Sequence, residues 1–218
     1  MWSQVQVDLE RILADKIYPV LLTDAVYRHF LAVAGIQPSS TSISPRQQEN
    51  FVTAAKIRAR IIVAEIARSG GLEEHSCCAK LTSGAVLYRF WDSRVPERRE
   101  GVWWFDQNVI NTCKRLGGRS ASDRREWLRQ NLAVSIDWSK MDRIDTISLG
   151  PKSEIPAVEG IGKPMRTYSP EAIPQGKIAS ADYWANYGKY FPGGVKQTVL
   201  PFIPTAQGVD LNSFLSRA

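Results

Sequence analysis

The feature that most constrains the fold is a change in sequence pattern at Gly70 and Gly71. Before these glycines, apolar residues recur every three or four positions, the spacing that places them on one face of an α-helix. After them, short β-branched and aromatic runs are separated by glycine and proline, a pattern typical of strands and turns. The sequence therefore predicts an α+β protein with a helical N-terminal bundle over residues 1–75 and a strand-rich, mostly antiparallel domain over residues 76–218.

The helical region is predicted to contain three helices and no chemistry. The first covers residues 3–17 and the second residues 22–34. The third begins with Ser44 as N-cap and Pro45 at the first helical position, and it ends at the glycine pair. His29 on the second helix is read as an ordinary surface or core histidine. The apolar face of the first helix consists of Val5, Leu9, Ile12 and Leu13.

The second region is predicted to hold five strands and one helix. The helix is expected to be capped by Ser122 and Asp123. Its apolar side consists of Trp127, Leu128, Leu132 and Val134. The strands are expected over residues 85–91, 101–105, 144–149, 155–159 and 197–203.

The composition indicates how the chain is stabilised and whether it can hold a metal. With 218 residues, 44% of them hydrophobic and 23% charged, the chain can bury a core without disulfides or a structural metal. The odd number of cysteines, Cys77, Cys78 and Cys113, favours a reducing compartment. With only two histidines and no C-x2-C spacing, we expect no metal site.

We expect neither a membrane span nor a conventional signal peptide in this chain. No apolar window approaches the ~18 residues that a span requires. The first residues contain neither a basic segment nor an apolar one. We expect a soluble protein that acts in a reducing cytoplasm, and delivery without a conventional signal peptide stays open.

The net charge of +6 comes entirely from the second region. Residues 1–75 carry eight basic and eight acidic side chains, whereas residues 76–218 carry twenty and fourteen. This excess suits an anionic ligand, either a dinucleotide or a nucleic acid, and a solvated basic face is the alternative.

Familiar catalytic motifs are missing from the sequence. It contains no G-x-G-x-x-G, no P-loop lysine, no G-x-S-x-G and no H-E-x-x-H. Neither His29 nor His75 lies beside a candidate nucleophilic serine, so a Ser-His-Asp triad is not expected.

Three segments of the second region nevertheless carry residues suited to one ligand. The first strand ends on Tyr88 and Arg89, and a planar guanidinium suits a phosphate or pyrophosphate. The second segment contains Trp103, Trp104 and Phe105, whose rings offer faces for a flat ring. In the third segment, Gly193 and Gly194 form a turn that lets a ligand approach the backbone, and Gln197 follows with an amide that can donate and accept.

The order of these segments resembles the ADP-ribosyltransferase superfamily, in which a strand-borne arginine, an aromatic strand and a late Glu or Gln surround NAD. The P-G-G-x-x-Q form of residues 192–197, with Lys163-Pro164 and Gly176 to Ala179 before it, resembles the tuberculosis-necrotizing-toxin family of NAD glycohydrolases. The likeness covers roughly residues 80–205 and leaves out the helical region. It implies a split β-sheet of ADP-ribosyltransferase type, with NAD as substrate rather than cofactor and NADP as an open second substrate.

The resemblance also implies a role for each segment. Arg89 would hold the pyrophosphate, an aromatic side chain would stack on nicotinamide, and Gln197 would contact the ribose or orient water. By strand alternation Trp103 and Trp104 face opposite sides, and we expect Trp104 to face the cleft. The alternatives are a salt bridge of Arg89 with Asp92 or Glu100, core positions for the tryptophans, and an exposed strand position for Gln197.

Three functions follow from this sequence. The first is an NAD glycohydrolase that acts as a toxin or effector, with an immunity or target protein as partner. The second is an ADP-ribosyltransferase on a protein or nucleic acid, because Glu154, Glu159 or Glu171 could replace a misassigned Gln197. The third is a non-enzymatic basic binding module, in which tryptophans stack on nucleic-acid bases.

Overall fold

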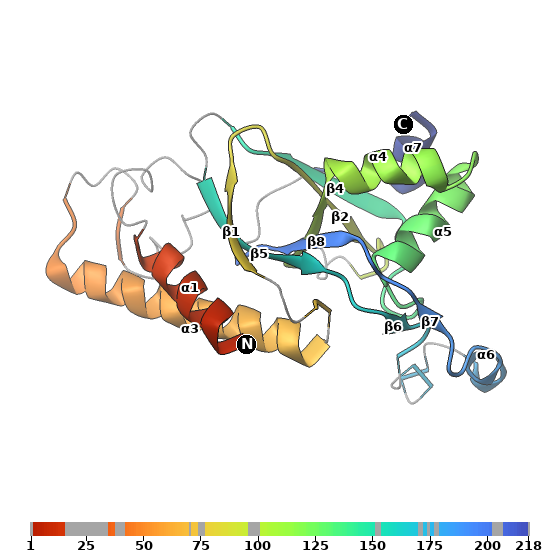
Figure 1. Ribbon diagram of the computed structural model, residues 1–218, viewed down its shortest axis with the longest axis horizontal. Helices are drawn as coiled ribbons and strands as arrows, with labels where there is room; N and C mark the ends of the chain where they lie inside the picture. The colour runs from red at the N-terminus through yellow and green to blue at the C-terminus, as the bar shows by residue number, and fades with distance from the viewer. Residues whose placement is uncertain are drawn as a thin grey trace.

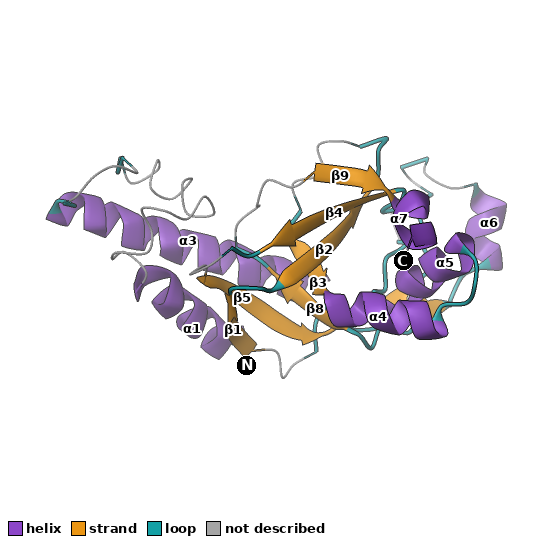
Figure 2. Ribbon diagram, turned by 90° about the horizontal axis from the view of Figure 1, so that it is seen from above, coloured by secondary structure: helices purple, strands orange, loops and turns teal. Residues whose placement is uncertain are grey.

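The computed structural model describes residues 2–15, 35–37, 42–69, 71–73, 77–95, 101–150, 154–169, 172–173, 175–176, 179–201 and 207–217. Within them the chain has an α+β fold, as the sequence predicts, built on a seven-stranded antiparallel sheet. Helices α1 and α3 lie at one end of the sheet, and α4, α5 and α7 lie at the other (Figures 1 and 2). The helix predicted over residues 22–34, with His29, lies outside the described residues, as does His75.

The helices and strands have the following bounds. The helices are α1 (Trp2–Asp15), α3 (Pro45–Ser69), α4 (Gln107–Leu116), α5 (Ala121–Asn131), α6 (Ser180–Ala185) and α7 (Leu211–Arg217). The strands of the large sheet are β1 (Cys77–Thr82), β2 (Val86–Trp91), β3 (Trp103–Asp106), β4 (Arg143–Ser148), β5 (Glu154–Ile161), β8 (Lys196–Val199) and β9 (Gln207–Asp210). Strands β6 (Met165–Arg166) and β7 (Tyr190–Phe191) form a separate two-stranded sheet.

The order of strands in the large sheet is β1-β5-β8-β3-β2-β4-β9, and β3 joins its two halves. Strand β3 pairs with β2 through Phe105 and Asp106 but with β8 through Trp103 and Trp104. Beyond Tyr88, strand β2 therefore pairs only with β4 among the described strands. This change of partner leaves Arg89 at the place where β2 and β3 separate.

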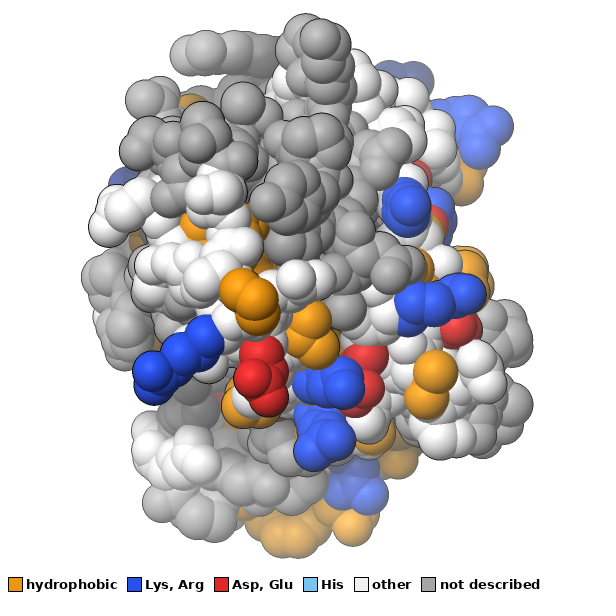
Figure 3. Space-filling model, turned by 90° about the vertical axis from the view of Figure 1, so that its left-hand side faces the viewer, with side chains coloured by type: hydrophobic (Ala, Val, Ile, Leu, Met, Phe, Trp, Pro, Cys, Tyr) orange, Lys and Arg blue, Asp and Glu red, His pale blue; other side chains and the backbone are white. Residues whose placement is uncertain are grey.

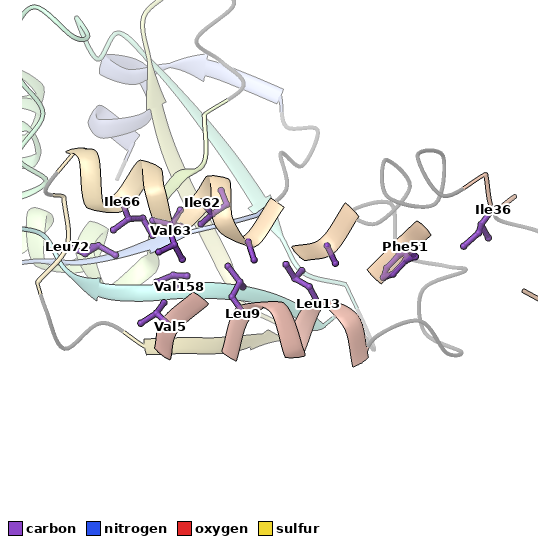
Figure 4. Packing of buried hydrophobic residues seen from close by; sticks show 13 residues of the cluster. Val5, Leu9, Leu13, Ile36, Phe51, Ile62, Val63, Ile66, Leu72 and Val158 are labelled. Atoms are coloured by element: carbon purple, nitrogen blue, oxygen red, sulfur yellow. The ribbon is translucent and has the colours of Figure 1, made fainter. Parts of the chain in front are cut away.

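The two N-terminal helices share one hydrophobic core with the sheet. Leu9 of α1 and Ile62 of α3 are fully buried, and Val158 of β5 and Val199 of β8 belong to the same cluster. Figure 4 shows Leu9 and Ile62 directed toward the strand that carries Val158. The division of the chain at residue 75 stays a prediction, and this shared core crosses it.

A second core lies under α4, α5 and α7. It joins Tyr88, Phe105 and Ile144 of the sheet to buried side chains of the three helices. The N-cap predicted for α5 is wrong: the helix begins at Ala121, and the hydroxyl of Ser120 accepts from the backbone N–H of Asp123. The Asp123 carboxylate in turn accepts from the backbone N–H of Ser120, which completes a capping box and explains why the helix starts there.

Strand β1 forms one edge of the large sheet. It pairs with β5 on one side, from Cys77 opposite Glu159 to Thr82 opposite Glu154. Its Cys78 Sγ donates to the backbone oxygen of Val5 in α1 at 3.2 Å. Lys80, in the middle of the strand, is exposed. Helix α1 therefore contacts the edge strand as well as the core.

Charges of both signs share the face seen in Figure 3, where Lys and Arg side chains stand beside Asp and Glu. The basic excess of the chain does not gather into a single-sign patch on the described part of this face. Among the described residues, no helix has the length and apolar composition that a membrane crossing needs.

Candidate functional site

A cavity of about 870 Å³ brings the three segments singled out in the sequence together. Its lining includes Arg89 of β2, Trp103 at the start of β3 and Gln197 of β8. These residues are far apart in sequence and meet where β2 and β3 separate. The end of α3, the turn that follows α5 and the segment after β5 complete the wall.

Arg89 is a buried cation in the wall of this cavity, with only 5% of its surface exposed. Its guanidinium carbon lies 5.8 Å from the centroid of the Trp104 ring, within the range of a cation–π contact. Asp145 lies directly opposite Arg89 on β4, and it too is buried. The Asp145 carboxylate accepts a hydrogen bond from the indole N–H of Trp91 at 3.1 Å, and the cation–π contact with Trp104 helps to fix the buried guanidinium of Arg89.

Gly101 leaves room for the Arg89 side chain. A Cβ atom on Gly101 would lie only 3.1 Å from the guanidinium carbon. The alternative of a salt bridge to Asp92 is wrong, because the Asp92 carboxylate instead accepts hydrogen bonds from Arg94. Glu100, the other proposed partner, lies outside the described residues.

The prediction that Trp104 faces the cleft is wrong, since Trp103 lines the cavity and Trp104 does not. Trp104 is 1% exposed and packs with Leu87 and Ile147 in a third hydrophobic cluster. On β3, Trp104 lies opposite Thr198 of β8 and Trp103 lies opposite Val199. The two indole rings therefore face opposite sides of the sheet. The indole N–H of Trp104 is buried and has no acceptor within the described part of the chain.

Tyr88 and Phe105 are also core residues rather than cavity residues. Their rings lie 5.9 Å apart within the cluster under α4, α5 and α7. The Tyr88 hydroxyl donates to Oε1 of Gln107, and burial raises the pKa of this hydroxyl. They were predicted to bind the ligand, but neither lines the cavity.

Gln197 is held in one orientation by its surroundings. Its side chain is 8% exposed, and its Nε2 donates to the carbonyl of Leu132 at 3.0 Å. A Cβ atom on Gly162 would lie 2.3 Å from this nitrogen, so only glycine fits beneath it. Because the nitrogen is bound to Leu132, the other amide atom is the oxygen, which makes no hydrogen bond within the described residues. That oxygen is an acceptor that a ligand in the cavity can use.

Gly193 and Gly194 do not line the cavity, contrary to the prediction that their turn admits a ligand. Both have positive φ angles, 67° and 91°. A Cβ atom on Gly193 would lie 2.5 Å from the backbone oxygen of Gly162. The glycines therefore make room for the backbone of Gly162 rather than for a ligand. The N–H of Gly194 donates to the same Gly162 oxygen at 2.9 Å. They position Gly162 and, through it, Gln197.

The turn that accepts the Gln197 hydrogen bond is itself built around a buried arginine that the sequence did not single out. The Arg129 guanidinium donates to the backbone oxygens of Val134, Ser135 and Lys140 at 3.1 to 3.4 Å. Burial lowers the pKa of Arg129. Ala133 in this turn has a φ of 52°, a left-handed conformation that a non-glycine residue keeps only when its surroundings impose it.

Two further charged residues line the cavity, one from the helical region, where the sequence indicated no chemistry, and one from the Lys163-Pro164 pair on which the resemblance partly rests. Glu65 lies near the end of α3, and Lys163 follows β5. The backbone N–H of Lys163 donates to the oxygen of Gly71 at 3.0 Å, which ties the end of the helical region to the sheet. The one sequence signal for Glu65 is its position between Ile62 and Ile66, at the margin of the buried face of the helix.

A second cavity, of about 930 Å³, adjoins the first and shares Asp92 and Trp138 with it. Asp92 is 2% exposed, and hydrogen bonds from Arg94 hold the pKa of its carboxyl well below the usual range. Arg129 and Lys140 also line this second space. The wall between the two cavities therefore contains charged side chains, among which Asp92 and Arg94 form an ion pair.

An exposed aromatic group lies on and beside α6. The rings of Trp184 and Tyr187 are 5.1 Å apart, and those of Tyr183 and Trp184 are 5.3 Å apart at nearly right angles. Trp184, Tyr187 and Tyr190 are each more than half exposed. A hydrogen bond from Arg166 to Tyr190 raises the pKa of that arginine.

No cluster of His, Cys, Asp and Glu in the described part of the chain has the arrangement of a metal site. All three cysteines are free thiols, and burial raises the pKa of Cys78 to about 12 and that of Cys113 to about 11. The thiols of Cys78 and Cys113 are therefore poor ligands and poor nucleophiles.

The comparisons with known proteins leave the family of this chain undefined. No protein family matches it, and no curated protein matches it. Among solved structures it is similar to the chain described as Rhs1-CT in complex with cognate immunity protein RhsI1. The identity is 11%, the match covers 64% of this chain and 83% of that chain, and the TM-score is 0.34. Similarity at this level establishes neither a common fold nor a common function.

Proposed function

We propose that this chain is an NAD glycohydrolase of ADP-ribosyltransferase type, similar to the tuberculosis-necrotizing-toxin family, and that it acts as a toxin or effector. The observation that carries the proposal is the meeting of Arg89, Trp103 and Gln197 in one cavity. They come from the three segments on which the resemblance rests. The separation of β2 from β3 beside Arg89 is what a split NAD-binding sheet would require.

Each of these residues has a role in the proposed reaction. The Arg89 guanidinium binds the pyrophosphate, with the Trp104 ring in contact with it. The Trp103 face stacks on the nicotinamide ring. The Gln197 oxygen accepts a hydrogen bond from a ribose hydroxyl or from the attacking water, and the bond to Leu132 keeps it in place.

The chemical step is hydrolysis of the bond between nicotinamide and ribose. The electron pair of this bond leaves with nicotinamide, which becomes neutral, and a cationic ribosyl centre forms. Water adds to that centre and loses a proton, so the products are nicotinamide, ADP-ribose and a proton. Because the leaving group needs no acid, the protein's task is to position substrate and water and to stabilise the cation.

The experiment that tests this proposal is an assay of NAD consumption by the full chain without an acceptor protein. Nicotinamide and ADP-ribose are measured separately. Release of both in equal amounts supports the glycohydrolase. Nicotinamide release that depends on an added protein or nucleic acid indicates a transferase, and no consumption of NAD or NADP refutes both. A toxin of this kind also implies an immunity protein in the producing cell.

The position of Glu159 argues against the transferase alternative. Its carboxylate forms an ion pair with Lys196 at 2.8 Å and accepts a hydrogen bond from Thr198. It does not line the cavity. Glu171 lies outside the described residues, and nothing is described of the Glu154 side chain.

The aromatic group of α6 favours a second candidate, a nucleic-acid-binding module. Exposed rings such as Trp184 and Tyr187 can stack on bases, and Arg166 beside them can contact phosphates. This candidate predicts salt-dependent binding of single-stranded nucleic acid without NAD turnover.

A further inference from the structure

The orientation of the Gln197 amide is set by a hydrogen bond to one backbone oxygen, that of Leu132. The two ends of an amide are nearly the same size, so hydrogen bonds decide which end is offered to a ligand. With Nε2 bound to Leu132, the oxygen is the free acceptor. If the Leu132 oxygen moved away, the amide could turn over and offer a donor instead. The proposed reaction needs the acceptor, because a ribose hydroxyl or the attacking water must donate to it.

The Leu132 oxygen lies in a turn with a strained backbone. Leu132 is the C-cap of α5, and the next residue, Ala133, has a left-handed φ of 52°. This conformation costs free energy in any residue other than glycine and persists only where the surroundings impose it. The turn therefore needs a group that holds it in place.

Arg129, in the last turn of α5, is that group. Its side chain is buried, and its guanidinium donates to three backbone oxygens at 3.1 to 3.4 Å. One guanidinium nitrogen contacts the oxygens of Val134 and Ser135, directly after Ala133, and a second contacts that of Lys140. A lysine ammonium is a single point of charge on a flexible stem, so it cannot reproduce this contact through two nitrogens.

The same end of α5 also contacts the glycine turn before β8. The backbone N–H of Gly193 donates to the oxygen of Gln130 at 3.1 Å. The helix end is therefore bonded both to the Gln197 side chain and to the turn that leads into its strand. We propose that Arg129 is a positioning residue of the proposed reaction, which holds the Leu132 oxygen so that the Gln197 amide offers its acceptor to the substrate. This inference rests on the proposed function.

The first test is a double-mutant cycle with the full chain. Arg129→Lys keeps the charge but removes the planar fork. We expect kcat for NAD to fall about tenfold and KM to change less than about twofold, because the groups proposed to bind the pyrophosphate and the ring lie on other strands. In the Gln197→Ala background, the same substitution should lower kcat less than about twofold, since no amide is left to orient. A merely structural role would lower kcat equally in both backgrounds.

The matched control is Arg124→Lys on the same helix. The Arg124 guanidinium also donates to two backbone oxygens, those of Gly118 and Leu215, at 3.3 and 2.7 Å. Neither oxygen belongs to the turn that holds Gln197. This variant loses a comparable set of hydrogen bonds, so we expect it to lose stability but to keep kcat within about twofold of the wild type.

The second test follows the Gln197 amide itself and needs no NAD. Its side-chain N–H resonances are assigned by their absence from the NMR spectrum of Gln197→Ala. In the wild type, the proton donated to Leu132 should exchange slowly with solvent, because it is buried and bonded. In Arg129→Lys we expect this exchange to be about tenfold faster, and in Arg124→Lys to be unchanged.

The outcomes distinguish this inference from the proposed function. If the wild type does not consume NAD, the proposed function fails and the inference falls with it. If NAD is consumed but Arg129→Lys lowers kcat equally in both backgrounds, or leaves kcat or the amide exchange unchanged, the inference alone is overturned. Should Arg129→Lys not fold, Ser135→Ala loosens the same turn by removing the 2.7 Å hydrogen bond from Ser135 Oγ to the Arg166 oxygen. A loss of kcat that depends on Gln197 is then expected, and its absence overturns the inference.

Discussion

Replacement of Gln197 by glutamate should make the stability of the protein depend on pH. In the wild type the Nε2 group of Gln197 donates to the backbone oxygen of Leu132 at 3.0 Å, and the side chain is almost fully buried. An ionised carboxylate has no proton to donate, so Gln197→Glu places two acceptors against each other. A protonated carboxyl group can still donate to Leu132. Folding should therefore raise the pKa of the introduced carboxyl group.

The magnitude follows from the hydrogen bond that is lost. Leaving a buried acceptor without its donor costs about 1–3 kcal/mol, and the carboxylate loses hydration as well. A loss of about 3 kcal/mol corresponds to a pKa raised by about two units above the ~4.3 of an unfolded glutamate. The folded state then binds more protons than the unfolded state between pH ~4.3 and ~6.5, so the variant loses stability as the pH rises through this window.

The measurement is urea unfolding of the wild type and of Gln197→Glu at pH 4 and pH 7.5. We expect the free energies of unfolding to differ by at most about 1 kcal/mol at pH 4 and by about 3 kcal/mol at pH 7.5. Gln48→Glu, at an exposed position on α3, is the control and should stay within about 0.5 kcal/mol of the wild type at both pH values. An equal loss at both pH values would refute the reasoning, since it would show that the hydrogen bond to Leu132 does not govern the position.

Three further predictions test the site and its supports. Arg89→Lys should lower nicotinamide release at least tenfold, because lysine cannot form the bidentate contact and each lost charge-assisted bond costs about 1.5–3 kcal/mol; near wild-type kinetics would place Arg89 away from the substrate. Gly193→Ala should lower the free energy of unfolding by at least about 2 kcal/mol, because φ is +67° and the new Cβ would meet the Gly162 oxygen at 2.5 Å; an unchanged urea midpoint would contradict this. Because Arg94 lowers the pKa of Asp92, the stability that this carboxylate provides is present above pH ~4 and is lost in stronger acid. The free energy of unfolding of Asp92→Asn should therefore change less between pH ~4 and pH ~2 than that of the wild type. Equal acid dependence in urea unfolding would count against that ion pair.

Strands β2 and β4 were predictable from the sequence because their β-branched and aromatic residues decide local structure. The strands predicted over residues 85–91 and 144–149 correspond to β2 and β4 within one residue at each end. Helix α4 was missed although Val109, Ile110 and Cys113 are spaced as on a helix face. It follows β3 without a loop, since Asp106 is both the last residue of the strand and the N-cap of the helix. Strand β1 was missed because edge strands show little apolar alternation.

The candidate site was predictable only in part, because tertiary pairing decides which face of an element is exposed. Strand alternation shows that Trp103 and Trp104 face opposite sides, but the pairing with β8 decides which side is core. The role of Gly193 was misassigned for a related reason, since a glycine pattern does not show whether a ligand or another strand approaches. Glu65 could not be assigned to the site at all, because nothing in the sequence of α3 says where that helix docks.

The contact between α1 and the edge strand β1 bears on the tendency of this protein to self-associate. An uncovered edge offers unpaired backbone groups to another chain, and proteins protect such edges with covering elements and charges. Here α1 covers part of the edge through the contact of Cys78 with Val5, and Lys80 places a charge in the middle of the strand. A protein from which α1 had been clipped or loosened would expose this edge together with the apolar surface around Leu9 and Val158. Its self-association by strand addition would then compete with refolding.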